Sequence, residues 1–196
     1  MINNKIIHNY LDSQIKCIDE LMKNHLLTLK KIFHIINKAK KNGNKIFIMG
    51  NGGSASTATH FTSDLLKTSL TKNTKKIKAF SLSDNIPLIL AWANDTSHEN
   101  IFKKQLENLL EKNDIVIGIS GSGNSANVLN AIKFANNENA ITISFTGKGG
   151  GKISKNSNVN LTVPSDDMLT IETMHLLICH LLTTLLRKSG KPLFPY

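Results

Sequence analysis

The chain has 196 residues, of which 40% are hydrophobic, and this suits one globular domain with a sizeable core better than two domains. No apolar run reaches the roughly 18 residues needed to span a bilayer, so we expect no membrane association. The formal net charge is +10, but every basic residue except Arg187 is Lys. Proteins that read nucleic-acid sequence rely on Arg for paired base contacts, and no helix-turn-helix, zinc-finger or RNA-binding pattern is found. We therefore expect a solvated basic surface, or one that attracts an anionic substrate, and no nucleic-acid partner.

The N-terminus and the cysteines indicate the compartment. Residues 1–11 are polar and mixed, unlike a secretory signal, so a cytoplasmic location is expected. Cys17 and Cys179 lie far apart and form no CxxC pair, and we expect two reduced, buried thiols.

Residues 1–41 are predicted to be helical, because apolar side chains recur there at helical spacing between faces of Lys and Asn. A bend near Lys23 and Asn24 would divide the stretch into two helices, and Gly43 suits a left-handed cap after the second. So long an apolar stripe ahead of a compact domain needs a surface to cover. Self-association into a helical bundle is the resulting hypothesis.

Beyond this stretch, short apolar runs alternate with helical patterns. Five strands are predicted at residues 45–50, 77–82, 114–120, 140–145 and 158–163, and helices at 54–67, 86–92, 100–111, from the loop at 121–125 to about 136, and 167–188. Continuous apolar strands alternating with helices indicate a parallel sheet covered on both faces. The predicted fold is therefore α/β. One domain spans 1–196, with an N-terminal helical extension over 1–42 and an α/β core over 45–188.

Two Ser/Gly-rich loops, at residues 50–56 and 120–125, each follow a predicted strand and open a helix. Ligands of open α/β sheets bind beyond the carboxyl ends of the strands, where helix N-termini present free N–H groups. Gly allows close backbone approach, and Ser and Asn add donors, so the two loops favour a phosphate site.

Other phosphate motifs fit less well. Neither loop has the GxxxxGK[ST] pattern of a P-loop. Gly121, Gly123 and Ala126 match the dinucleotide fingerprint only loosely, and no acidic residue follows at the end of a second strand. No nucleotide cofactor is expected. Simple turns and helix caps remain the alternative to a phosphate site.

Five segments together resemble phosphoheptose isomerases of the sugar isomerase (SIS) family: FIMGNGGSASTATHF, SDNIPLILAWANDTS, GISGSGNSANVLNAI, TGKGGG and VPSDDMLTIETMHLLICH. The resemblance covers nearly the whole chain. It implies a SIS fold, a homotetramer with active sites at subunit interfaces, and one zinc ion per subunit. It also implies interconversion of sedoheptulose 7-phosphate and D-glycero-D-manno-heptose 7-phosphate, a step toward the nucleotide-activated heptose of lipopolysaccharide or capsule.

An aldose–ketose isomerisation moves a proton between C1 and C2, so it needs a base, an acid and a group that stabilises the oxyanion. His60 and Asp64 lie four residues apart, on one face of a predicted helix. Glu172 and His180 lie two turns apart on the last helix, roughly 12 Å, so one metal can hardly take both from a straight helix. Either they have different roles or they come from different subunits. His175, on the same helix, is expected to be packed or at an interface.

The resemblance assigns roles to individual residues. The implied metal ligands are His60, Asp64, Glu172 and His180, and Asp64 and His180 are the implied acid–base pair. The implied substrate-binding residues are Asn51, Gly52, Gly53, Ser54, Asp64, Asn94, Asp95, Ser120, Gly121, Ser122, Ser125 and Glu172.

Two departures affect this assignment. Better-known members carry Glu at the position of Asp64 and Gln at that of Glu172, and an Arg one turn beyond the carboxylate, where this chain has Lys67 and Thr68. The shorter Asp64 changes its reach, and the charge of Glu172 favours a bound cation. A non-catalytic SIS protein that binds a replication initiator or another protein is the main alternative. A SIS-type DNA-binding regulator would need a separate DNA-binding domain.

Overall fold

Five parallel strands form one sheet within residues 3–194, which the computed structural model describes. The predicted domain limits at 1 and 196 lie outside the described residues. In sheet order the strands are β2 (Lys78–Ser81), β1 (Lys45–Met49), β3 (Ile115–Ser120), β4 (Ile141–Thr146) and β5 (Val159–Thr162). The predicted α/β fold with a five-stranded parallel sheet is confirmed.

The strand order reverses beside β1, which pairs with β2 on one side and with β3 on the other. The chain therefore extends the sheet in opposite directions from β1, with β2 on one side and β3, β4 and β5 on the other. In open α/β sheets such a point leaves a crevice at the carboxyl ends of the strands. The loops after β1 and β3, the two loops singled out in the sequence, meet at this point.

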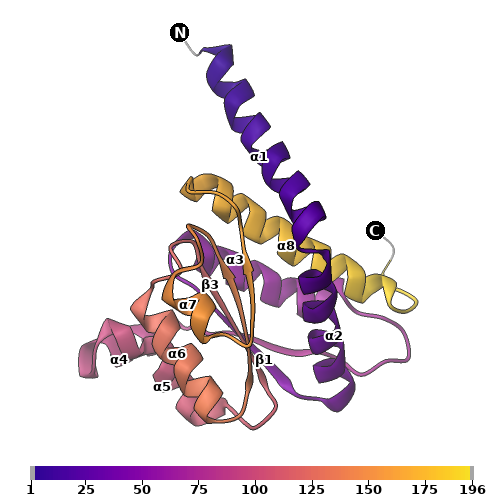
Figure 1. Cartoon of the computed structure of the whole chain (residues 1–196). Helices are drawn as coiled ribbons and strands as arrows, with labels where there is room; N and C mark the ends of the chain where they lie inside the picture. The colour runs from indigo at the N-terminus through magenta and orange to yellow at the C-terminus, as the bar shows by residue number, and fades with distance from the viewer. Residues whose placement is uncertain (1–2, 195–196) are drawn as a thin grey trace.

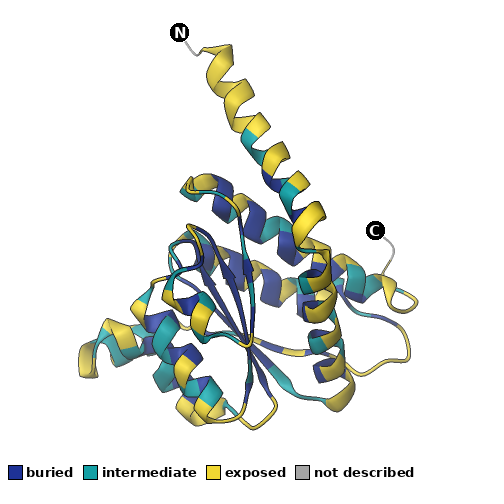
Figure 2. Ribbon diagram, viewed as in Figure 1, coloured by how far each residue is buried: buried dark blue, intermediate teal, exposed yellow. Residues whose placement is uncertain are grey.

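Helices cover both faces of the sheet (Figure 1). One face carries α1 (Asn4–Asn24), α2 (Leu26–Asn42), α3 (Gly53–Ser63) and α8 (Met168–Lys188). The other carries α4 (Ile86–Asp95), α5 (Ile101–Leu109), α6 (Ala126–Asn137) and α7 (Gly151–Asn156). Side chains alternate along β1, because Ile46 and Ile48 pack into the first layer while Phe47 and Met49 pack into the second. Both layers are buried along the strands (Figure 2).

The N-terminal helices separate at His25, one residue beyond the predicted bend, and Gly43 ends α2 in the predicted left-handed conformation with φ of 82°. The first half of α1 extends away from the sheet (Figure 1). It exposes large apolar side chains, among them Ile6, Ile7, Leu11 and Ile15. An apolar stripe without cover in one chain is consistent with self-association.

Helix α8 is long and apolar enough, by length and composition, to cross a membrane, although no unbroken apolar run of that length was found in the sequence. Half of its apolar window is buried inside the fold. It contacts α1, α2, α3 and β4, so it is a core helix of the domain.

Three differences from the predicted elements are local. The helix predicted at 54–67 ends at Ser63 and continues as one π-helical turn, η1 (Asp64–Thr68). A short 3-10 turn, η2 (His98–Asn100), precedes α5. Helix α7 was missed, because it begins at the last glycine of a run of three and its six residues are too few for a periodic apolar pattern. Cys17 and Cys179 are free and buried, as expected.

Candidate functional site

The loops after β1 and β3 line one cavity of about 280 Å³ at the carboxyl ends of these strands. This is near the lower end of the range for small-molecule sites. The lining residues are Asn51, Gly52, Gly53, Ser54, Ile119, Ser120, Gly121, Ser122, Ser125, Met168 and Glu172. Nine of the predicted substrate-binding residues are thus found together in this lining. Its two other members, buried Ile119 and half-buried Met168, were not predicted, and Asp64, Asn94 and Asp95 lie elsewhere.

Three serine hydroxyls gather in the second loop. The Oγ of Ser120 lies 3.0 Å from that of Ser125 and 3.5 Å from that of Ser122. Ser125 occupies the N-cap position of α6, yet its side chain makes no capping hydrogen bond. The first two backbone N–H groups of α6, those of Ala126 and Asn127, therefore lie beside the three hydroxyls without a cap from Ser125. This combination of donors and helix dipole suits a phosphate group.

An amide pair joins the first loop to α6. Asn51 and Asn127 exchange two side-chain hydrogen bonds, each 2.9 Å long. The Asn127 oxygen also accepts from the backbone N–H of Val128 at 2.9 Å. Asn127 was not predicted, since no sequence pattern distinguishes it from other Asn residues. The Asn51–Asn127 pair fixes the position of the first loop relative to the start of α6, which follows the second loop.

The second loop is supported from outside by the turn after β4. The Gly123 carbonyl accepts from the backbone N–H of Ile153 at 2.9 Å, and the Asn124 side chain accepts from that of Lys152 at 3.1 Å. Gly123 has φ of 65°, and a Cβ on it would overlap the Gly150 carbonyl. The GKGGG motif therefore supports the phosphate loop, because its glycines let the two backbones pack closely.

Glu172 reaches this cavity from α8. A Cβ on Gly53, the first residue of α3, would collide with the Glu172 carboxylate. The carboxylate therefore lies at the N-terminal end of α3, where the helix dipole favours a negative charge. The first loop thus already faces an anion, and the serine loop is the better place for a phosphate.

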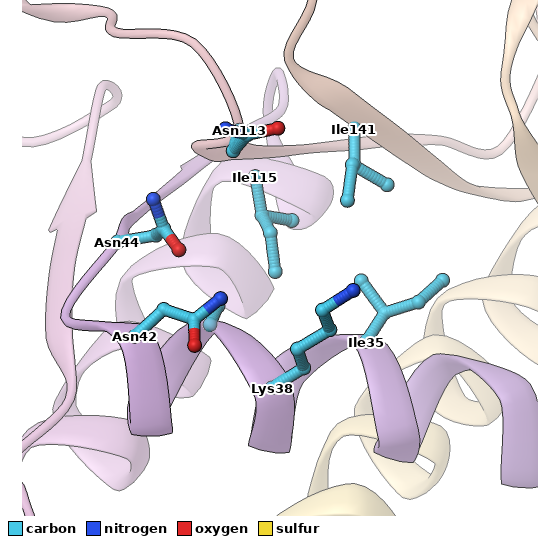
Figure 3. A pocket seen from close by; sticks show the side chains of 8 residues that line it. Ile35, Lys38, Asn42, Asn44, Asn113, Ile115 and Ile141 are labelled. Carbon is cyan, nitrogen blue, oxygen red and sulfur yellow. The ribbon is translucent and has the colours of Figure 1, made fainter.

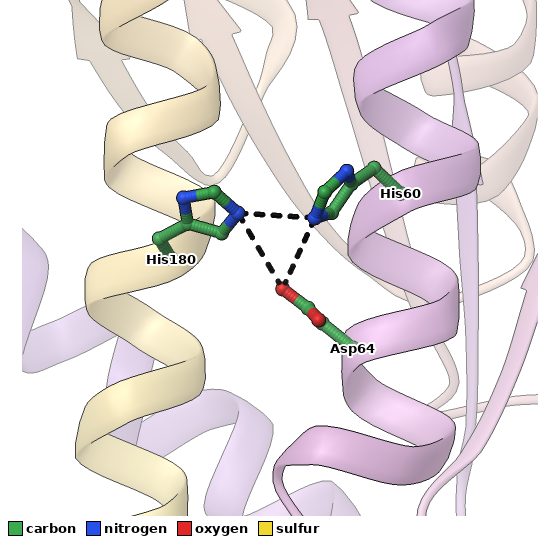
Figure 4. Close-up of side chains that lie close together, drawn as sticks. All are labelled: His60, Asp64 and His180. Atoms are coloured by element: carbon green, nitrogen blue, oxygen red, sulfur yellow. Dashed lines mark hydrogen bonds and ion pairs between the residues drawn. The ribbon is translucent and has the colours of Figure 1, made fainter. Parts of the chain in front are cut away.

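His60, Asp64 and His180 form a second cluster, between α3, η1 and α8 (Figure 4). The two histidine Nε2 atoms lie 3.0 Å apart. Asp64 Oδ2 is 3.7 Å from Nε2 of His60 and 3.8 Å from Nε2 of His180. The side chains of His60 and His180 are 49% and 51% exposed, and that of Asp64 is 15% exposed. The cluster is therefore open to a ligand from solvent.

The donor set of this cluster fits a zinc ion. Two ligands of a tetrahedral zinc at the usual bond lengths lie about 3.3 Å apart. The three observed separations, 3.0, 3.7 and 3.8 Å, bracket this value. Catalytic zinc sites use three protein ligands of this kind and leave one position for water or substrate. Glu172 does not belong to the cluster within one chain.

Other residues lie away from both groups. Asn94 and Asp95 are exposed at the end of α4, where the Asn94 amide donates to Asp95 at 3.0 Å. His175 was expected to be either packed inside the chain or at an interface, and it is fully buried inside the chain. Its Nε2 atom lies 3.1 Å from the Thr146 carbonyl oxygen. Burial lowers the pKa of His175 to about 4, so it is neutral near pH 7.

A separate cavity of about 320 Å³ lies between α2 and the amino-terminal ends of the central strands, at the opposite end of the sheet from the serine loop (Figure 3). Its lining includes Ile35, Lys38 and Asn42 on α2, Asn113 just before β3 and Ile141 at the start of β4. No carboxylate or imidazole belongs to this lining, so the cavity offers no acid–base pair.

Comparison with known proteins gives consistent results. Residues 9–147 match the SIS domain family. The chain is 40% identical over 183 residues to a phosphoheptose isomerase of Helicobacter pylori (strain ATCC 700392 / 26695), covering 93% of this chain and 94% of the relative. It is 39% identical over 163 residues to a probable phosphoheptose isomerase of Thermoplasma acidophilum, covering 82% and 89%.

Solved structures agree over the same length. A phosphoheptose isomerase from Francisella tularensis superimposes with a TM-score of 0.89 at 30% identity, covering 96% of this chain and 100% of the other. One from Neisseria gonorrhoeae superimposes with a TM-score of 0.87 at 28% identity, covering 94% and 98%.

Proposed function

The chain belongs to the phosphoheptose isomerases of the SIS family, and on this premise we propose that it interconverts D-sedoheptulose 7-phosphate and D-glycero-D-manno-heptose 7-phosphate. The observation that carries the proposal is the pairing of two sites along α8. The serine-lined cavity suits the phosphate, and the His60–Asp64–His180 cluster suits the reacting end of the sugar.

The spacing of the two sites supports a long sugar. Glu172 at the cavity and His180 at the cluster are eight residues apart on α8, which corresponds to about 12 Å. Eight bonds separate the phosphorus of a heptose 7-phosphate from C1, so an extended molecule spans about 10 Å at about 1.2 Å per bond. A pentose 5-phosphate has two bonds fewer and spans only about 7 Å. An extended heptose 7-phosphate therefore matches this spacing better than a pentose 5-phosphate does.

The phosphate would bind the hydroxyls of Ser120, Ser122 and Ser125 and the N-terminus of α6. Asn51, Gly52, Gly53, Ser54 and Gly121 would shape the wall against the sugar. Glu172, whose carboxylate lies in this wall, can accept from sugar hydroxyls. Its place here supports a substrate-binding role, and its predicted role as a metal ligand would require a cluster from another subunit.

Asp64 and His180 form the proposed acid–base pair for the enediol route. One takes the proton from carbon, and the other exchanges a proton with the neighbouring oxygen. His60 holds its Nε2 beside both and orients the pair. A zinc ion held by His60, Asp64 and His180 would supply electrophilic stabilisation of the developing oxyanion.

We also propose a cytoplasmic homotetramer with active sites at subunit interfaces. The exposed apolar face of α1 supports self-association. Helix α4 supports it too, since none of its residues is buried although Ile86 and Leu90 are apolar. Asn94 and Asp95, at the exposed end of α4, would then face the site of a neighbouring subunit. Light scattering after size-exclusion chromatography tests the assembly, and a monomer at micromolar concentration would refute it.

The decisive experiment incubates the protein with sedoheptulose 7-phosphate, with and without added zinc, and measures the aldose product. His180→Gln should abolish turnover, whereas His34→Gln, which changes an exposed histidine on α2, should not. Lack of product under both conditions would refute the proposed function and leave the non-catalytic alternative.

A further inference from the structure

The turn that carries Asp64 is not an ordinary α-helical turn. In η1 the backbone N–H of Ser69 donates to the Asp64 carbonyl at 2.9 Å, a bond across five residues. The Ser69 hydroxyl, which is buried, donates to the Leu65 carbonyl at 2.8 Å. This side chain satisfies a carbonyl of the widened turn. Single π-turns of this kind occur often at functional sites.

Within η1 the hydroxyl of Thr68 has an unusual hydrogen-bond acceptor. Thr and Ser in helices commonly donate to the backbone carbonyl four residues earlier. Thr62, Thr183 and Thr184 all do so here, at 2.8, 2.9 and 2.8 Å. Thr68 donates instead to Oδ1 of the Asp64 side chain, at 3.0 Å.

This bond determines which oxygen of Asp64 faces the histidines. With Oδ1 bound to Thr68, Oδ2 is left at 3.7 and 3.8 Å from the two Nε2 atoms. Asp is one methylene shorter than the Glu that the family resemblance leads one to expect at this position. The shorter Asp side chain has fewer rotamers with which to bring an oxygen toward the histidines, so a hydrogen bond that fixes its orientation matters more.

We propose that Thr68 is a positioning residue, which holds the Asp64 carboxylate so that a single oxygen is directed at His60 and His180. The proposal rests on the proposed role of Asp64 in the active site. Hydrogen bonds to a ligating carboxylate orient it, and losing such a partner typically costs 10- to 100-fold in metal affinity or activity. Thr68 does not line the serine cavity, so phosphate binding should be unaffected.

The test compares Thr68→Val, Thr68→Ser and, if the Val variant does not fold, Thr68→Ala, with thermal unfolding as the check on folding. Zinc affinity is measured by competition with a chelator, and kcat and KM by product formation. We expect about 10- to 100-fold weaker zinc binding and lower kcat for the Val or Ala variant, unchanged KM, and recovery in Thr68→Ser. Thr184→Val, which removes a hydroxyl that donates to the His180 backbone carbonyl and to no carboxylate among the described residues, is the matched control and should match the wild type.

The outcomes separate this proposal from the proposed function. A wild type without turnover refutes the function and the positioning role with it. An active wild type whose folded Thr68→Val variant, or Thr68→Ala variant in its place, retains zinc affinity and kcat within twofold refutes the positioning role alone. If the active wild type binds no zinc, kcat decides: a loss in the Val or Ala variant with recovery in the Ser variant supports positioning, and any other pattern refutes it.

Discussion

Gly123→Ala tests how closely the phosphate loop depends on its backbone support. A Cβ on Gly123 would lie 2.5 Å from the Gly150 carbonyl carbon and 2.9 Å from the Gly151 nitrogen. Ordinary contacts between such atoms are about 3.5 Å, so one of the two loops must move by about 1 Å. The neighbouring atoms are backbone, which cannot rotate away.

The expected loss follows from this displacement. A shift of 1 Å in a positioning element can cost about 100-fold in rate, which is about 2.7 kcal/mol. The left-handed φ of 65° adds a folding penalty of about 1–2 kcal/mol for any residue with a Cβ. We therefore expect kcat/KM for sedoheptulose 7-phosphate to fall about 100-fold, mainly through KM, together with a moderate loss of stability.

Gly149→Ala separates the two effects. Gly149 also has a positive φ, 73°, but nothing lies within 4 Å of a Cβ built on it. It should lose similar stability and keep its kcat/KM. The assays are product formation, calorimetric titration with inorganic phosphate and chemical denaturation. If Gly123→Ala keeps wild-type phosphate affinity and KM, the argument that the loop is fixed by this contact is wrong.

Three further predictions concern charge and protonation. His175 binds a proton below about pH 6.5 when unfolded but only near pH 4 when buried, so the free energy of unfolding is highest above pH 6.5 and falls by roughly 3 kcal/mol toward pH 4. Chemical denaturation of His175→Leu should show a weaker pH dependence over this window, and an unchanged pH dependence would contradict the assignment. Glu172→Gln removes a negative charge from the phosphate cavity and should tighten inorganic phosphate binding by about tenfold at low salt, measured by calorimetry; weaker binding would show that the carboxylate supports the loop instead. Chelation of zinc should abolish turnover but leave the phosphate affinity measured by calorimetry within about twofold of the untreated protein, because the cluster and the cavity are about 12 Å apart on α8. Loss of both turnover and phosphate binding would indicate a single coupled site.

Much of this protein was determined by local sequence. Short apolar runs between turn residues, such as that at β1, are typical of buried strands, and Gly43 ends α2 because few other residues adopt its φ. The two Ser/Gly loops could be located at strand ends, since strands, helices and their connections each leave a pattern within a few residues. The family resemblance then pointed to His60, Asp64, Glu172 and His180.

Only the tertiary structure decided how those residues are divided. His60, Asp64 and His180 converge from α3, η1 and α8, while Glu172 joins the phosphate cavity, because α8 carries the two sets two turns apart. The π-turn, the Asn51–Asn127 pair and the Gly123–Gly150 contact depend on neighbours distant in the sequence or on bonds between side chain and backbone. Periodicity reports which face of an element is buried, but it carries no information on which distant element lies against that face, and in this protein that packing sets the geometry of the site.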